Sequence, residues 1–111
     1  MATVSLPTPD AVGALALGST NGKVLLMASD PVAVCPAPSA ANYIDLVDYN
    51  SNVSCAEGTK LGSLSNLQGA VRNGGGCTDT DNNLADFTVM LMDGVSTAPR
   101  TSASPVGPTC Q

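Results

Sequence analysis

Short apolar runs separated by turn-forming residues predict several β-strands. Lys23–Ser29 (KVLLMAS) is nearly continuous in apolar residues, as in a buried strand. Tyr43–Tyr49 (YIDLVDY) begins with alternating apolar and polar residues, and the alternation slips at Val47, where we expect a bulge or the end of the strand. Two more strands are expected at Gln68–Arg72 and at Asp86–Met92, the latter rich in β-branched and apolar residues.

An earlier apolar stretch, AVGALAL (residues 11–17), precedes these strands. Its leucines alternate with smaller alanines, which favours a strand, with a helical turn as the alternative. The pair Asn21–Gly22 follows, and such a pair adopts the left-handed conformations of a tight hairpin turn. We therefore expect a strand, a turn, and then the strand that begins at Lys23.

The remaining segments are rich in proline and small polar residues. Residues 1–10 form an extended leading segment, because Pro7 and Pro9 restrict the backbone. Residues 30–42 are expected to be a loop or a sheet edge, and residues 95–111 an irregular tail. Short strands without long helical periodicity or an internal repeat predict an all-β sandwich or barrel, in a single domain that spans residues 1–111.

Composition and charge narrow the function. Nine acidic residues against four basic ones give a net charge of −5, which disfavours direct nucleic-acid binding. No apolar run approaches the roughly 18 residues of a membrane-spanning helix, so we expect no membrane insertion. The chain has no histidine, which removes Ser-His-Asp and Cys-His nucleophile systems and His-ligated zinc. We therefore expect no catalysis by this chain.

Four cysteines, Cys35, Cys55, Cys77 and Cys110, are the candidates for reinforcing a core that has only three aromatic residues. They form no C-x-x-C pair, which argues against a structural zinc site. Four cysteines permit three disulfide pairings, and the sequence alone leaves the choice open. The even cysteine number and the low charge favour an oxidised, extracellular or cell-surface chain, with buried thiols in a cytosolic protein as the alternative.

The loop NGGGCTDTDNNLADF (Asn73–Phe87) carries the candidate chemistry. Asp79, Asp81 and Asn83 alternate along it and Asp86 follows, an arrangement of oxygen ligands that suits calcium. The spacing does not match a calcium-binding helix–loop–helix. The alternatives are a turn shaped by hydrogen bonds from Asp and Asn side chains, without metal, and a contact with a partner.

Several motifs resemble one known family. GGCTDTDNNLADFTV followed by PRTSASP is similar to the C-terminal part of the lamin-tail-like domains of secreted bacterial proteins. LPTPDAVGALALGSTNGKVLLM, the CP at Cys35–Pro36, IDLVDYN and SCAEG fit the same pattern in order. Such domains often accompany extracellular endonuclease/exonuclease/phosphatase-type nucleases. The resemblance implies an immunoglobulin-like β-sandwich, secretion, a non-catalytic role, and the disulfide pairs Cys35–Cys55 and Cys77–Cys110.

The sequence departs from this family in three places. The opening strands have no counterpart, so the expected sandwich is incomplete at its N-terminus. Asp48 stands where the family usually has glycine, and Met90–Thr97 is an insertion. A sheet that lacks strands has an unpaired edge, which favours binding to a protein partner or self-association.

The leading functional interpretation is a non-catalytic extracellular binding or structural module that anchors or positions a larger secreted protein, such as a nuclease. One alternative is a self-assembling surface or fibre subunit completed by strand pairing. The other is part of a secreted nuclease or phosphatase that depends on a divalent metal. Calcium is the one cofactor that the sequence suggests.

Overall fold

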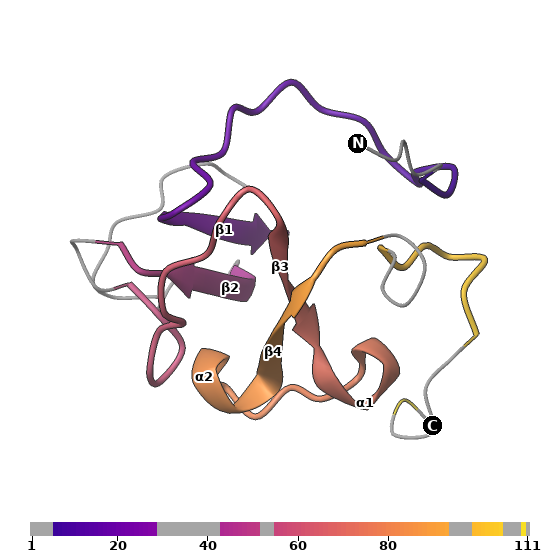
Figure 1. Ribbon diagram of the computed structural model, residues 1–111. Coiled ribbons are helices and arrows are strands. Elements are labelled where there is room, and N and C mark those ends of the chain that lie inside the picture. The colour runs from indigo at the N-terminus through magenta and orange to yellow at the C-terminus, as the bar shows by residue number, and fades with distance from the viewer. Residues whose placement is uncertain (1–5, 29–42, 52–54, 94–98, 106–109, 111) are drawn as a thin grey trace.

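The computed structural model describes residues 6–28, 43–51, 55–93, 99–105 and 110. In these ranges the chain is β-rich, with two small antiparallel sheets of two strands each (Figure 1). Strand β1 (Gly22–Met27) pairs with β2 (Tyr43–Tyr49), and β3 (Gln68–Arg72) pairs with β4 (Phe87–Leu91). Two single helical turns, α1 (Asn73–Gly76) and α2 (Asn83–Asp86), lie between β3 and β4. The predicted β-rich class is thus confirmed.

The β1–β2 sheet departs from the prediction in one detail. Its register pairs Gly22 with Tyr49 and Leu25 with Leu46, and the irregularity lies between Leu26 and Met27. The bulge or strand end predicted at Val47 is wrong. Strand β2 continues past this point because neighbouring segments bind the backbone on its outer side, as described below for the candidate site.

The strand predicted over residues 11–17 is absent from the structure. This segment has neither helix nor strand, and Val12 and Leu15 are 87% and 86% exposed. The hairpin turn predicted at Asn21–Gly22 is also wrong, since β1 pairs with β2 instead. The Tyr49 hydroxyl donates to the Gly18 carbonyl oxygen at 2.7 Å and fixes the chain just before β1.

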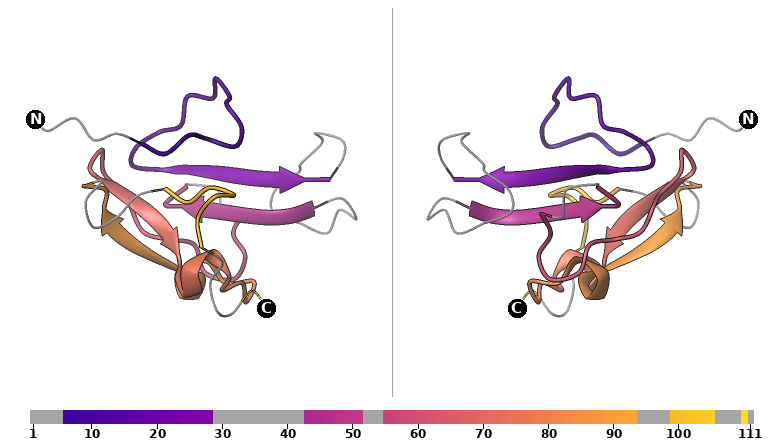
Figure 2. Two further views of the ribbon diagram at one scale, coloured as in Figure 1. Left: turned by 90° about the vertical axis from the view of Figure 1, so that its right-hand side faces the viewer. Right: turned by 90° about the vertical axis from the view of Figure 1, so that its left-hand side faces the viewer.

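The two sheets lie next to each other with their strands running in different directions (Figure 2). Arg72 at the end of β3 joins them, since its guanidinium is 2.6 Å from Asp45 Oδ2 on β2. The same guanidinium lies over the Phe87 ring, 4.4 Å from its centroid, a favourable cation–π distance. An open hollow of about 550 Å³ remains between the sheets, lined by Val24 and Val47 on one side and Ala70 and Phe87 on the other.

The buried part of the described chain is small and largely polar. Its apolar members are Leu46, Tyr49, Cys55 and Leu61, and its polar members are Asp48, Ser51, Glu57, Asn83 and Asp86. A buried polar group is costly unless it is hydrogen-bonded, so the fold depends on the bonds these side chains make.

Asp48 organises the turn after β2. Its carboxylate accepts hydrogen bonds from the Ser51 hydroxyl at 2.6 Å, the Ser51 amide at 3.1 Å and the Cys55 amide at 3.0 Å. Burial would raise the pKa of Asp48, but these hydrogen bonds, with a contribution from the positive charge of Lys23, outweigh burial and lower it. Asn50, in a left-handed conformation, completes the turn.

The termini are described only in part. Residues 6–10 of the predicted leading segment have no helix or strand, and residues 1–5 lie outside the described ranges. In the predicted tail, Cys110 forms a disulfide with Cys77, and the two Cα atoms are 5.1 Å apart. Ser102 binds the Asp10 carboxylate through its amide at 2.7 Å and also through its hydroxyl. No helix among the described residues has the length and apolar character to cross a membrane.

Candidate metal site

The candidate site is built on the loop between β3 and β4. Gly74 and Gly75 have φ values of 65° and 67°, a left-handed conformation that glycine adopts without strain and that reverses the chain after β3. Asn73 holds this reversal against β4, because its Oδ1 accepts from the Thr88 hydroxyl at 2.6 Å and its Nδ2 donates to the Ala85 carbonyl oxygen at 3.1 Å.

Asp86 fixes the second half of the loop from inside. Its buried carboxylate accepts from the Thr80 hydroxyl at 2.6 Å, the Thr80 amide at 2.9 Å and the Asn82 amide at 3.2 Å. Burial would raise the pKa of Asp86, but these bonds outweigh burial and, with the charge of Arg72, lower it. The Asn82 side chain accepts from the Ala85 amide at 3.3 Å and caps α2.

Asn83 connects the loop to β2. Its buried side chain accepts from the Asp48 amide at 2.9 Å and donates to the Leu46 carbonyl oxygen at 2.8 Å. Its backbone amide donates to the Glu57 carbonyl oxygen at 2.8 Å. These bonds bring the segment that contains Glu57 and the acidic loop together on the same side of β2.

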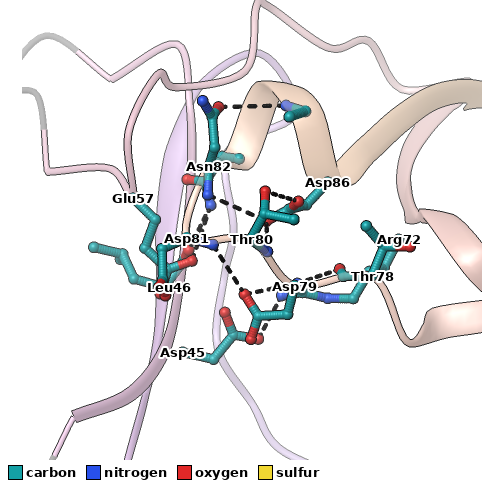
Figure 3. Close-up of polar contacts among 12 residues, drawn as sticks. Asp45, Leu46, Glu57, Arg72, Thr78, Asp79, Thr80, Asp81, Asn82 and Asp86 are labelled. Atoms are coloured by element: carbon teal, nitrogen blue, oxygen red, sulfur yellow. Dashed lines mark hydrogen bonds and ion pairs between the residues drawn. The ribbon is translucent and has the colours of Figure 1, made fainter. Parts of the chain in front are cut away.

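Three carboxylates meet at this junction: Glu57, Asp79 and Asp81 (Figure 3). One oxygen atom from each lies within 4.8 Å of the others, which is a spacing that could hold a metal ion. Glu57 is buried, whereas Asp79 and Asp81 are exposed. Asp81 adopts a left-handed φ of 56°, and its amide donates to Asp79 Oδ1 at 3.4 Å, so the turn presents both aspartates toward Glu57.

The charge of this carboxylate cluster is only partly compensated. Burial raises the pKa of Glu57, and the negative charges of Asp79 and Asp81 raise it further. The charge of Arg72 opposes this rise of the pKa, but its guanidinium is 3.6 Å from Asp79 and is shared with Asp45. A bound cation would remove the repulsion that Glu57 experiences.

The predicted ligand set is divided by the structure. Asp79 and Asp81 lie in the cluster, whereas Asp86 binds Thr80 and Asn82 and shapes the loop, in the way expected for a hydrogen-bonded turn. The Asn83 side chain binds β2 and also donates to Glu57 Oε2 at 3.4 Å, so it supports the cluster from beside it. Glu57 was not predicted. It is distant from the loop in the sequence, and the two segments meet through non-local bonds, from the Asn83 amide to the Glu57 carbonyl oxygen and from the Leu84 amide to the Thr59 carbonyl oxygen.

Two more side-chain environments complete the site. Asp45 Oδ1 is buried and has no hydrogen-bond partner among the described residues, while its Oδ2 binds Arg72.

The loop is tied to the tail through the Cys77–Cys110 disulfide. Cys55 is buried and also disulfide-bonded. Its expected partner, Cys35, lies outside the described residues.

Comparison with known proteins adds no relative to this picture. No family model, curated protein or solved structure matches the chain.

Proposed function

We propose that the chain is a non-catalytic accessory module of a secreted protein and that it binds calcium at Glu57, Asp79 and Asp81. The observation that supports the metal site is the convergence of these three carboxylates from two separate segments onto oxygen atoms within 4.8 Å of one another. The fixed turn of the acidic loop and the buried position of Glu57 mean that the site is largely formed before an ion arrives.

Calcium suits this donor set better than magnesium. Calcium takes six to eight oxygen ligands in flexible geometry, including backbone carbonyls and water, whereas magnesium demands a near-ideal octahedron and dehydrates reluctantly. The cluster combines one buried carboxylate with two exposed ones, so water can supply further oxygen ligands. Its excess negative charge, which raises the pKa of Glu57, favours a divalent cation.

The accessory role is supported by the sequence. Without histidine, the chain lacks the residue most used for acid–base and nucleophilic chemistry near neutral pH. The resemblance to lamin-tail-like domains implies an immunoglobulin-like sandwich that positions a larger protein such as a nuclease. Two small antiparallel sheets and a disulfide are compatible with such a secreted domain.

The direct test is calorimetric titration of the full chain with calcium, together with thermal melts in calcium and in chelator. We expect saturable binding and a higher melting temperature in calcium. A ligand that binds only the folded state adds about 2.7 kcal/mol at a concentration of 100 times its dissociation constant.

Asp81→Asn is the informative variant, because asparagine also tolerates the left-handed backbone at this position. It should weaken calcium binding without lowering the melting temperature in chelator, because it removes one of the charges that repel Glu57. Asp10→Asn, at an exposed carboxylate bound to Ser102, is the matched control and should bind calcium normally. A wild-type melt that is indifferent to calcium would leave the loop as a turn alone. Magnesium- or calcium-dependent hydrolysis of DNA or phosphate esters by the purified chain would refute the non-catalytic role.

A further inference from the structure

Residues 11–17 belong to no helix or strand and are exposed along their whole length. Leu15, near the middle of this segment, is 86% exposed. No residue of the segment forms a hydrogen bond within the described part of the chain. Its backbone amides and carbonyls are therefore left to the solvent, and no bond of the described fold has to open before another molecule can reach them.

The segment is presented between two fixed points. Before it, the Asp10 carboxylate accepts from the Ser102 amide at 2.7 Å, and after it, the Gly18 carbonyl oxygen accepts from the Tyr49 hydroxyl at 2.7 Å. Between these points the chain forms a loop that projects from the sheets (Figure 2). A Cβ at Gly13 would meet nothing within 4 Å, so the space around the loop is open.

Such a loop is the form of chain that an endoprotease can bind. Proteolytic nicking concentrates at exposed loops whose backbone is neither buried nor hydrogen-bonded. A protease holds the chain in an extended conformation by main-chain hydrogen bonds, and a side-chain pocket selects the residue before the bond that is cut. Paired strands and helices first have to open, because their main-chain groups are already bonded.

The residues of the segment select the kind of protease. Leu15 is a large apolar side chain between two alanines, and residues 11–17 contain no charge and no proline. The small neighbours allow the backbone to enter a narrow cleft, whereas the leucine fits an apolar pocket of the kind that distinguishes chymotrypsin from trypsin. The Leu15–Ala16 bond therefore matches an endoprotease with an apolar primary pocket.

Other exposed leucines of the described chain are less suitable. Leu6 is followed by Pro7, whose ring removes the backbone N–H and restricts the conformation at the bond. Leu67 and Leu84 are exposed, but each has a backbone hydrogen bond to a distant segment. The exposed leucines of β1 and β4 belong to paired strands. Leu17 lines the hollow between the sheets, and the residue after it is the bound end of the segment.

We propose that the Leu15–Ala16 bond is a processing site for an endoprotease of this class. Hydrolysis adds water across the bond and leaves a carboxylate on Leu15 and an amino group on Ala16. Residues 16–111 keep the strands β1 to β4. Residues 1–15 contain no cysteine, and within the described ranges they are hydrogen-bonded to the remainder through the exposed contact of Asp10 with Ser102. Cleavage thus releases residues 1–15 from a folded remainder.

The test is limited proteolysis of the full chain by chymotrypsin in native buffer, with the fragments identified by mass spectrometry. We expect the Leu15–Ala16 bond to be cut before any other bond in the described ranges, and residues 16–111 to keep a cooperative thermal melt. Leu15→Asp should slow cleavage of this bond about tenfold or more, because a carboxylate does not suit an apolar pocket. Leu6→Asp, at an exposed leucine before Pro7, is the matched control and should be cut at the wild-type rate.

A destabilised variant distinguishes cleavage of the native chain from cleavage after unfolding. Cleavage that requires unfolding follows the population of the unfolded state. Asp86→Asn, which weakens the bonds that hold the acidic loop, should leave the rate at Leu15–Ala16 unchanged, because the segment is accessible in the native chain. Faster cleavage of this variant, a first cut elsewhere in the described ranges, wild-type cleavage of Leu15→Asp, or an unfolded product would each overturn the proposal. The test is made without calcium, so its result is independent of the proposed metal site.

Discussion

Asn83 binds the backbone of β2 at Asp48 and so joins the acidic loop to the first sheet. Its Oδ1 accepts from the Asp48 amide at 2.9 Å, and its Nδ2 donates to the carbonyl oxygen of Leu46 at 2.8 Å. Both groups are buried, and the amide side chain supplies the donor and the acceptor that a neighbouring strand would otherwise provide. One side chain thus replaces part of a sheet.

Asn83→Ala is expected to lower the free energy of unfolding by about 2–4 kcal/mol, because it leaves two buried backbone groups of β2 without partners. Urea unfolding at neutral pH measures the loss. Asn66→Ala, at an exposed turn residue, is the control and should change stability by less than about 0.5 kcal/mol. Equal effects of the two substitutions would contradict the role assigned to Asn83.

Asp48 should make the stability depend on acid. Its folded pKa is lowered, so its stabilisation is fully present above the unfolded pKa of about 3.9 and disappears as the pH falls through the folded pKa. Asp48→Asn should therefore cost about 2 kcal/mol at pH 7, and the difference from wild type should shrink in strong acid. Melting temperatures of both proteins from neutral to acid pH provide the test. A difference that stays constant with pH would assign the cost to geometry instead of charge.

Glu57 should act in the opposite sense. Its pKa is raised, so its contribution to stability is greatest below the unfolded pKa of about 4.3 and is lost as the pH rises through the folded pKa. In chelator at pH 7, Glu57→Gln should stabilise the chain by up to about 1 kcal/mol, because it removes one charge from the repelling cluster. The gain should vanish at low pH, and calcium should no longer stabilise the variant. Destabilisation in chelator at neutral pH would show that the Glu57 charge is already balanced.

Gly22 lies against the aromatic ring of Tyr49. A Cβ at this position would come within 2.7 Å of Tyr49 Cζ, closer than atoms pack. Gly22→Ala should therefore cost about 1–3 kcal/mol and disturb the bond from the Tyr49 hydroxyl to Gly18. Gly62→Ala is the matched control, since a Cβ there meets nothing within 4 Å and should be tolerated. Thermal unfolding of the two variants and the wild type measures the difference in stability between them.

The strands were predictable where their pattern was local. The five residues of β3 and the seven of β2 coincide with the predicted ranges, because turn-forming residues bound each apolar run. The strand predicted over residues 11–17 failed for a tertiary reason. The alternation of large and small side chains indicates which of them would be buried in a strand. It does not provide the neighbouring strand that would bury them.

The candidate site was predictable only in part. The alternation of Asp79 and Asp81 indicated carboxylates in one turn, and the structure brings them together with Glu57. The roles of Asn83 and Asp86 depend on burial and on long-range partners, which spacing along the loop does not encode. The sequence shows which groups carry oxygen, and the fold decides which oxygens remain available to an ion.

The composition of the buried interior has a thermal consequence. Five of the nine buried residues described are polar or charged, so unfolding hydrates polar side chains as well as apolar ones. Hydration of polar groups lowers the heat capacity change of unfolding, which is about 12–15 cal/mol/K per residue in ordinary domains. A smaller value flattens the curve of stability against temperature. The free energy of unfolding of such a chain stays similar from low to high temperature. It rises only slightly at the temperature of maximum stability.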